Sequence, residues 1–163
     1  MSCSVLQKKR SCALADMRAV IQRVSRSRVT VGDEVIGAIG SGLMVLLGVA
    51  EGDDTRDADL LVDKITGLRI FDDAGGKMNL SLADVHGEML VISQFTLFAD
   101  TRRGRRPSFR EAAGGDAALQ LYEYFITRVR SSGLTVANGA FGEMMAVELV
   151  NDGPVTIILD SKK

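Results

Sequence analysis

Three polar side chains interrupt an apolar stretch that runs from Met89 to Asp100. Ser93, Gln94 and Thr96 place two hydroxyl groups and one amide among aliphatic and β-branched residues, a composition typical of a buried strand. A buried polar group costs roughly 1–3 kcal/mol unless it finds a hydrogen-bond partner. These side chains therefore either satisfy one another inside the fold or line a pocket that binds a polar ligand.

The segment that follows, residues 101–110, carries the densest positive charge of the chain. A polar strand end that leads into a basic loop favours an anionic substrate, because cationic side chains bind phosphate groups without reading sequence. The alternative is a solvated surface loop beside a strand whose hydroxyls are already satisfied. The arginines concerned are Arg102, Arg103, Arg105, Arg106 and Arg110.

A second candidate segment, Asn151-Asp152-Gly153-Pro154, lies close to the C-terminus. Its composition is typical of a turn, since glycine supplies unusual φ angles and proline fixes its own. A Gly-Pro bond is also a place where a cis peptide costs only roughly 0.5–1 kcal/mol. In that geometry the two carbonyl groups could contact a ligand without any side chain, so both interpretations stay open.

Composition excludes several kinds of site. His86 is the one histidine of the chain and sits in an expected turn, so a His-rich zinc site is excluded and a Ser-His-Asp triad is disfavoured. Cys3 and Cys12 both precede Met17, so no thiolate metal site or disulfide forms downstream, and a reducing, cytoplasmic location is expected. With a net charge of −1, affinity for a polyanion must come from local basic patches. No apolar run approaches the ~18–20 residues of a membrane span.

Hydrophobic periodicity predicts the elements that position these residues. We expect a single α/β domain with a mixed, β-rich sheet, two main helices packed on one side, and α/β/β layers. Residues 17–163 form this domain, and residues 1–16 read as a disordered or non-native tail that resembles a transit peptide only weakly. The buried strand 43–49, the helix 57–69 and the strand 89–97 predict a parallel βαβ unit. The other expected elements are strands 18–24, 29–31, 35–39, 134–136, 144–150 and 155–159, and a second helix that follows residues 114–116 and ends at Gly133.

Two of these segments together resemble the signature motifs of D-aminoacyl-tRNA deacylases, also called D-tyrosyl-tRNA deacylases. They are Ser93-Gln-Phe-Thr-Leu-Phe-Ala99 and Asn151-Asp-Gly-Pro-Val-Thr156. The resemblance extends over nearly all of residues 17–160, and both motifs occur in order, which makes it highly specific. It also includes the segments 18–24, 46–49, 69–71, 76–80 and 106–109.

The resemblance implies a carboxylic ester hydrolase of translation quality control. The family removes D-amino acids, and glycine mischarged on tRNA-Ala, from the 3′-terminal adenosine of tRNA, and it spares L-aminoacyl-tRNA. The resemblance further implies homodimers with active sites at the subunit interface, and no metal or organic cofactor. No membrane partner is expected.

The same resemblance assigns roles to individual residues. Ser93, Gln94, Phe95 and Thr96 line the reaction centre. Gly153 and Pro154 form a cis peptide that reaches into the partner subunit's pocket and excludes an L side chain. Substrate contacts are further expected from Met145 at the terminal adenine, from Phe109 and from Asn151, and tRNA phosphates are assigned to Arg102, Arg103, Arg105 and Arg106.

Two mechanisms remain open for the reaction centre. Thr96 could attack as a nucleophile, although the sequence offers no base that would activate it. Alternatively, the ribose 2′-hydroxyl of the substrate helps to activate water, and backbone N–H groups around Phe95 and Thr96 stabilise the oxyanion; this alternative is favoured. Two rival functions are a nucleic-acid-binding module without catalysis and a generic Thr- or Ser-dependent esterase.

Overall fold

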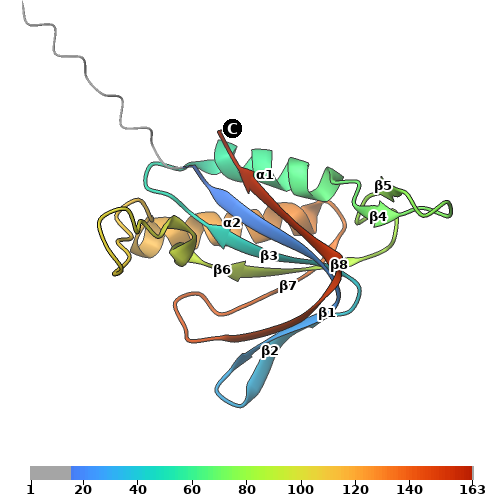
Figure 1. Ribbon diagram of the computed structural model, residues 1–163, viewed down its shortest axis with the longest axis horizontal. Coiled ribbons are helices and arrows are strands. Elements are labelled where there is room, and N and C mark those ends of the chain that lie inside the picture. Colours follow the sequence, from blue (N-terminus) through green and yellow to red (C-terminus); the bar gives the residue numbers. More distant parts are fainter. Residues whose placement is uncertain (1–15, 163) are drawn as a thin grey trace, which may run out of the picture.

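The computed structural model describes residues 16–162 (Figure 1). The tail expected over residues 1–16 therefore lies, except for Asp16, outside the described residues. The strands are β1 (Arg18–Val31), β2 (Glu34–Ile39), β3 (Gly42–Gly48), β4 (Phe71–Asp72), β5 (Met78–Leu80), β6 (Glu88–Ser93), β7 (Thr135–Asn138) and β8 (Ala146–Asp160). The helices are α1 (Thr55–Gly67), α2 (Gly115–Ser131) and the short 3₁₀ helix η1 (Phe95–Phe98).

The main sheet is mixed and has the strand order β2-β1-β3-β6-β7, with β8 paired to the other edge of β1. Strand β3 is parallel to β6, so the expected β3-α1-β6 unit is confirmed, and β6 is parallel to β7. Strand β1 runs antiparallel to its three neighbours: its first half pairs with β3, its second half with β2, and nearly its whole length with β8. Strands β4 and β5 form a separate two-stranded ribbon.

Successive residues of a strand point to opposite faces of the sheet. Because β3 and β6 are apolar at successive positions, both faces of the sheet carry hydrophobic side chains. On one face Val45 and Val91 pack against α1 and α2, which lie on the same side of the sheet as expected. On the other face Met44 and Leu90 pack against side chains of the first half of β8. Strand β2 also contacts β6 and β7. The sheet thus folds back on itself and is nearly closed (Figure 1).

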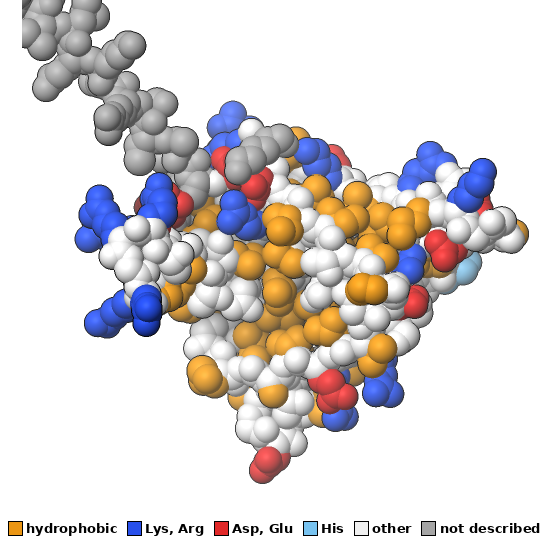
Figure 2. Space-filling view, in the orientation of Figure 1, with side chains coloured by type: hydrophobic (Ala, Val, Ile, Leu, Met, Phe, Trp, Pro, Cys, Tyr) orange, Lys and Arg blue, Asp and Glu red, His pale blue; other side chains and the backbone are white. Residues whose placement is uncertain are grey.

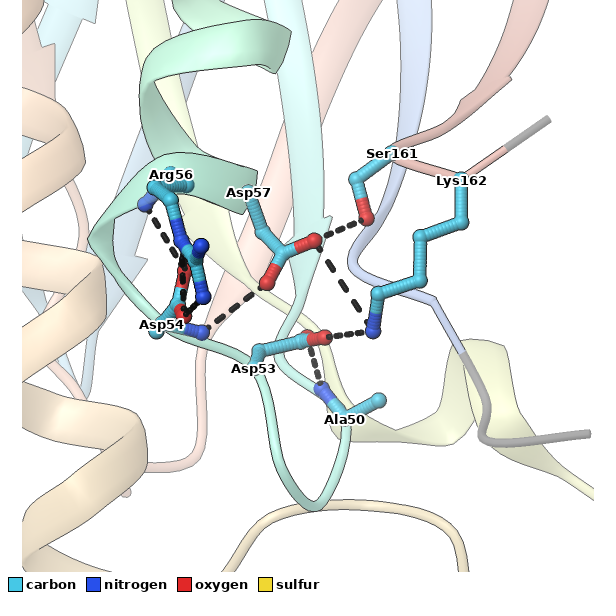
Figure 3. A network of polar contacts seen from close by, with 7 residues as sticks. All are labelled: Ala50, Asp53, Asp54, Arg56, Asp57, Ser161 and Lys162. Carbon is cyan, nitrogen blue, oxygen red and sulfur yellow. Dashed lines mark hydrogen bonds and ion pairs between the residues drawn. The ribbon is translucent and has the colours of Figure 1, made fainter.

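Helix α1 begins with a capping box, which also fixes the C-terminal end of β8 (Figure 3). The side chain of Asp54 accepts from the backbone N–H of Arg56, and Asp57 Oδ2 accepts from the backbone N–H of Asp54. The second oxygen of Asp57 accepts from Ser161 Oγ at 2.8 Å, and Lys162 Nζ lies 3.6 Å from Asp53 Oδ1. The end of β8 is thereby attached to the start of α1.

The structure corrects three predicted boundaries. Segments 18–24 and 29–31 belong to one continuous strand, because β8 pairs with residues 26–30 of β1 and carries the ladder through the polar segment between them. Likewise, segments 144–150 and 155–159 are one strand, β8, and Asn151–Pro154 forms an irregularity within it instead of a turn between two strands. Proline is tolerated there because β8 lies at the edge of the sheet. The strand predicted over 89–97 ends at Ser93, where the chain turns into η1.

Candidate functional site

The segment with the interrupting polar residues forms a tight turn on the end of β3. After β6 ends, the backbone N–H of Gln94 donates to the carbonyl of Leu47 at 2.8 Å, and η1 follows. Gly48 lies directly beneath this turn: a Cβ atom there would lie 2.8 Å from the Phe98 ring and 3.1 Å from the carbonyl oxygen of Gln94. The close approach therefore requires glycine at position 48. We call residues 93–98 the catalytic turn, after the role that we propose for them.

The side chains of the catalytic turn contact one another and the basic loop. Gln94 Nε2 donates to Thr96 Oγ1, and Thr96 is exposed. Phe95 is 56% exposed, and its ring makes a T-shaped contact with Phe109 at a centroid distance of 5.1 Å. The first N–H groups of a helix have no acceptor within that helix, so the amides of Phe95 and Thr96 are available to a ligand oxygen. The turn therefore offers an aromatic wall beside two backbone donors.

Met145 lies at the same end of β6. It is partly buried against the hydrophobic cluster that contains Ile92. Its sulfur would lie 2.6 Å from a Cβ atom at Gly139, and the backbone N–H of Gly139 donates to the carbonyl of Val91 at 3.1 Å. The fold thus gathers Met145, Phe109 and the catalytic turn, and it adds the loop at Gly139, which the sequence analysis did not single out.

The basic loop is closed by a short backbone ladder. Asp100 and Ser108 exchange two backbone hydrogen bonds of 2.8 and 2.9 Å. Arg102 folds back onto Asp100, with Nη2 2.7 Å from Oδ2, and these hydrogen bonds hold the pKa of Asp100 well below its usual range. The loop borders an open cavity of about 620 Å³. Its lining includes Phe98 of the catalytic turn together with Arg102, Arg103, Arg106 and Arg110, whereas Arg105 does not line it.

The peptide bond between Gly153 and Pro154 is cis, as the resemblance implied, and both residues are exposed. Gly153 has a φ of +140°, a conformation that L side chains rarely adopt. Asn151 closes this irregularity: its Oδ1 accepts from the backbone N–H of Val155 at 2.7 Å, and its Nδ2 donates to the carbonyl of Val155 and to Thr156 Oγ1. The amide of Asn151 is therefore engaged within its own loop.

Arg23 supports this loop from below, and the sequence analysis missed it. The side chain of Arg23 is 9% exposed, its Nε donates to the carbonyl of Asp152 at 2.9 Å, and its Nη1 donates to the carbonyl of Ile70 at 2.7 Å. Carboxylates of Asp72 and Asp152 lie 3.7 Å away and balance the buried charge. The available signal was an arginine at the centre of an apolar strand, since a charged residue is rarely buried without partners.

The two motifs lie far apart within one chain. Arg18 pairs with Gly48 beneath the catalytic turn, whereas Val24, six residues further along β1, pairs with Asn151. Six residues of strand span roughly 20 Å. In Figure 1, β6 ends on the left of the molecule and the middle of β8 lies on the right. The fold of a single chain thus does not bring Gly153 and Pro154 to the catalytic turn.

Residues 16–162 contain neither a metal-binding cluster nor a membrane-spanning helix. Within this range no group of three or more His, Cys, Asp and Glu side chains is arranged to hold a metal ion. His86 adopts a φ of +51° in the turn that precedes β6, so it lies at the opposite end of that strand from Ser93. No helix in the described range has the length and apolar character needed to cross a membrane.

Comparison with known proteins places the chain beside one family. The sequence profile of D-Tyr-tRNA(Tyr) deacylase matches residues 20–160. A D-aminoacyl-tRNA deacylase of Desulforamulus reducens is 58% identical over 147 residues, which cover 90% of this chain and 99% of the relative. A protein of the same name from Dehalococcoides mccartyi is 62% identical over 146 residues, covering 90% and 95% respectively.

Solved structures support the same fold. A protein described as the c-Myc DNA unwinding element binding protein superimposes with a TM-score of 0.85 at 42% identity, over 90% of this chain and all of the other. A probable eukaryotic D-amino acid tRNA deacylase superimposes with a TM-score of 0.76 at 19% identity, covering 88% and 98%. At that identity the second likeness supports the fold alone.

Proposed function

This chain belongs to the D-Tyr-tRNA(Tyr) deacylase family, and on that basis we propose how its residues hydrolyse D-aminoacyl-tRNA. It is a hydrolase of tRNA proofreading. The observation that carries the proposal for the site is the exposed turn of Gln94, Phe95 and Thr96, which offers backbone donors beside the ring of Phe109. We place the reaction centre at this turn, with Ser93 at the end of β6.

In the proposed reaction, water adds to the carbonyl carbon of the aminoacyl ester, and the bond to the ribose 3′ oxygen breaks. The amides of Phe95 and Thr96 hold the oxyanion, because donors fixed before the reaction need not reorganise when charge develops. Asp100, two residues after the catalytic turn, is a poor base, because its hydrogen bonds with Arg102 hold its pKa well below the usual range. We therefore assign activation of the water to the substrate's ribose 2′-hydroxyl, and Thr96 to a positioning role.

We further propose a homodimer that completes the site. Among the described residues β8 is paired on one edge alone, and this strand of 15 residues leaves a row of backbone groups for another chain. Ile158 is 64% exposed and Val150 41% exposed on this strand. Figure 2 shows hydrophobic side chains gathered over the middle of the face that β8 crosses. A second copy that covers this face could bring its own Gly153 and Pro154 towards the catalytic turn.

In such a dimer, the carbonyl groups of Gly153 and Pro154 face the α-carbon of the substrate and leave no room for an L side chain. Support comes from the exposure of both residues and from the rigid frame that Arg23 and Asn151 build around them. Specificity then depends on backbone atoms, so D-amino acids with different side chains, and glycine, are accepted. Met145 contacts the terminal adenine in this arrangement.

We assign the acceptor-stem and CCA-end phosphates to the basic loop. Arg103, Arg106 and Arg110 line its cavity and, within the described residues, form no ion pair. Arg102 is already paired with Asp100, so it contributes less to phosphate binding than the others. The cavity borders Phe98 of the catalytic turn, which places bound phosphates close to the scissile ester.

Two deacylation time courses with the full chain test the proposal. D-Tyr-tRNA and L-Tyr-tRNA are incubated with the purified protein, and spontaneous hydrolysis is subtracted from both. Rapid loss of the D-ester while the L-ester is spared is the expected result. Acceleration of neither ester by a folded protein that still binds tRNA would overturn the reaction and favour a nucleic-acid-binding module.

A further inference from the structure

We propose that Arg18 and Asp160 form a clasp that positions the catalytic turn for the reaction. Arg18 Nε lies 2.7 Å from Asp160 Oδ1, and Nη2 lies 3.4 Å from Oδ2. The third nitrogen of the guanidinium, Nη1, donates to the carbonyl oxygen of Leu97 at 3.2 Å. One side chain thus joins the end of β8 to the backbone of the catalytic turn. The inference rests on the proposed location of the reaction centre at that turn.

The planar guanidinium suits this role. Two of its nitrogens engage the carboxylate side by side, and the third remains free to donate in another direction. The guanidinium carbon of Arg18 also lies 5.9 Å from the ring centroid of Phe98, which fixes the side chain against the turn. The hydrogen bond with Asp160 raises the pKa of Arg18 above its ordinary value, so the charge persists at every physiological pH.

The carboxylate of Asp160 is itself held in place. Arg18 and Asp160 lie directly opposite each other in the β1–β8 ladder. The next residue, Ser161, donates its backbone N–H to the carbonyl of Met17 at 2.9 Å and its hydroxyl to Asp57 of α1. Asp160 is 10% exposed, whereas Arg18 is 34% exposed. The clasp is therefore built on the anchored end of β8.

The catalytic turn is consequently held by two sets of contacts, one with β3 and one with Arg18. Gly48 beneath it permits close approach to β3, and the backbone N–H of Gln94 fixes its start. Arg18 fixes its end through the carbonyl of Leu97, one residue after Thr96. Amides that hold an oxyanion must lie within a few tenths of an ångström of the correct position. Release of the carbonyl of Leu97 would let the amides of Phe95 and Thr96 move without removing any group that touches the substrate.

The test uses single-turnover deacylation of D-Tyr-tRNA by Arg18→Gln, Arg18→Lys and Asp160→Asn variants of the full chain. Arg28→Gln is the matched control, because Arg28 pairs with Glu148 across the same two strands, at 2.8 Å, with both side chains exposed. We expect Arg18→Gln to lower the maximal single-turnover rate at least tenfold. The protein concentration that gives half of this maximal rate should stay within twofold of the wild-type value. Arg18→Lys keeps the charge beside Asp160 and recovers part of the rate, and Arg28→Gln matches wild type.

Other outcomes overturn the inference in distinguishable ways. An unchanged maximal rate in folded Arg18→Gln, whatever its melting temperature, would mean that the clasp has only a structural role. If the maximal rate is unchanged but a higher protein concentration is needed for half of it, and if tRNA affinity depends less on salt, Arg18 binds a tRNA phosphate instead. Gly48→Ala displaces the catalytic turn directly and must also reduce the maximal rate. If wild type is active and Gly48→Ala is equally active, the reaction centre lies elsewhere, and the proposed site is wrong independently of the clasp.

Discussion

The Nε of Arg23 donates to the carbonyl oxygen of Asp152 at 2.9 Å, immediately before Gly153 and Pro154. The two residues are 129 positions apart in the chain, yet the guanidinium is nearly inaccessible and reaches the carbonyl of Ile70 at the same time. An arginine that bridges two carbonyl groups in this way fixes the position and orientation of the exposed Gly-Pro peptide. The frame of the proposed chiral filter thus begins in β1.

Replacement of Arg23 by lysine tests that frame. A single ammonium group cannot reach both carbonyl oxygens, so one buried acceptor loses its partner and the free energy of unfolding falls by about 1–3 kcal/mol. We also expect L-Tyr-tRNA to be hydrolysed faster relative to D-Tyr-tRNA, because the Gly-Pro peptide is less firmly held. Arg26→Lys, on an exposed residue of the same strand, is the control and leaves both quantities unchanged. If the ratio of D-Tyr-tRNA to L-Tyr-tRNA hydrolysis rates is unaltered in Arg23→Lys, Arg23 does not contribute to chiral specificity.

Gly153→Ala addresses the filter directly. Its Cβ atom would lie 2.8 Å from Val155 Cγ2 and 3.0 Å from the backbone nitrogen of Val155, at a φ of +140°. We expect a loss of about 1–3 kcal/mol in stability and at least a tenfold fall in the ratio of D to L hydrolysis rates. Gly32→Ala, also at positive φ but with no atom within 4 Å of its Cβ, controls for backbone conformation alone. Retention of full discrimination by a folded Gly153→Ala protein would contradict the assignment.

Thr96→Ala separates the two mechanisms. Thr96 Oγ1 accepts a hydrogen bond from Gln94 Nε2, and within residues 16–162 it is not hydrogen-bonded to a base, so we expect the variant to keep most of the deacylation rate. The measurement is single-turnover hydrolysis of D-Tyr-tRNA, with tRNA binding followed in parallel. Complete loss of hydrolysis with intact folding and binding would establish a nucleophilic threonine instead.

Salt dependence reports on the basic loop. Each phosphate contact that is lost reduces the slope of log affinity against log salt by about 1, whatever the sequence of the tRNA. Arg106→Gln removes one unpaired cation from the cavity and should reduce the slope by that amount. The control is Arg128→Gln on α2, where Nε is 2.9 Å from Asp59 and away from the loop. Equal slopes for Arg106→Gln and wild type would remove this residue from the phosphate site.

Asp53 makes stability depend on pH near neutrality. Its side chain is fully buried beside α1 (Figure 3), and burial raises its pKa to about 6 from an ordinary value near 4. Between about pH 4 and 6 the folded protein holds a proton that the unfolded chain releases. The free energy of unfolding therefore falls as pH rises through this window, by at most ~3 kcal/mol.

Asp53→Asn cannot titrate, so its stability relative to wild type should increase from pH 4 to pH 7. Chemical denaturation at several pH values measures this difference. Asp73→Asn is the control: backbone N–H groups lower the pKa of Asp73, and its contribution to stability is lost only as pH falls below about 4. The difference between Asp73→Asn and wild type should accordingly stay flat from pH 5 to pH 7. A flat difference for Asp53→Asn as well would show that its carboxyl titrates normally.

Much of this protein is determined by local sequence pattern. Apolar periodicity located both helices and the buried strands, and the β3-α1-β6 unit followed from their order. The polar residues between Ser93 and Thr96 stood out because they interrupt an apolar run, and the Asn151–Pro154 segment stood out because its composition is typical of a turn. Composition alone excluded a His-rich zinc site, because a chain with one histidine cannot supply several histidine ligands, wherever that residue lies.

Tertiary structure decided how those segments relate to one another. Strand β8 continues through Gly153 and Pro154 because β1 pairs with the residues of β8 both before and after them. No local sequence pattern encodes that register. The two contacts that support the proposed site, Arg23 with Asp152 and Arg18 with Asp160, join residues that are 129 and 142 positions apart. Their side chains read in the sequence as ordinary cations of a strand. Only folding places each guanidinium against a particular carbonyl or carboxylate, because hydrogen bonds depend on distance and direction, which sequence spacing does not fix across so long a separation.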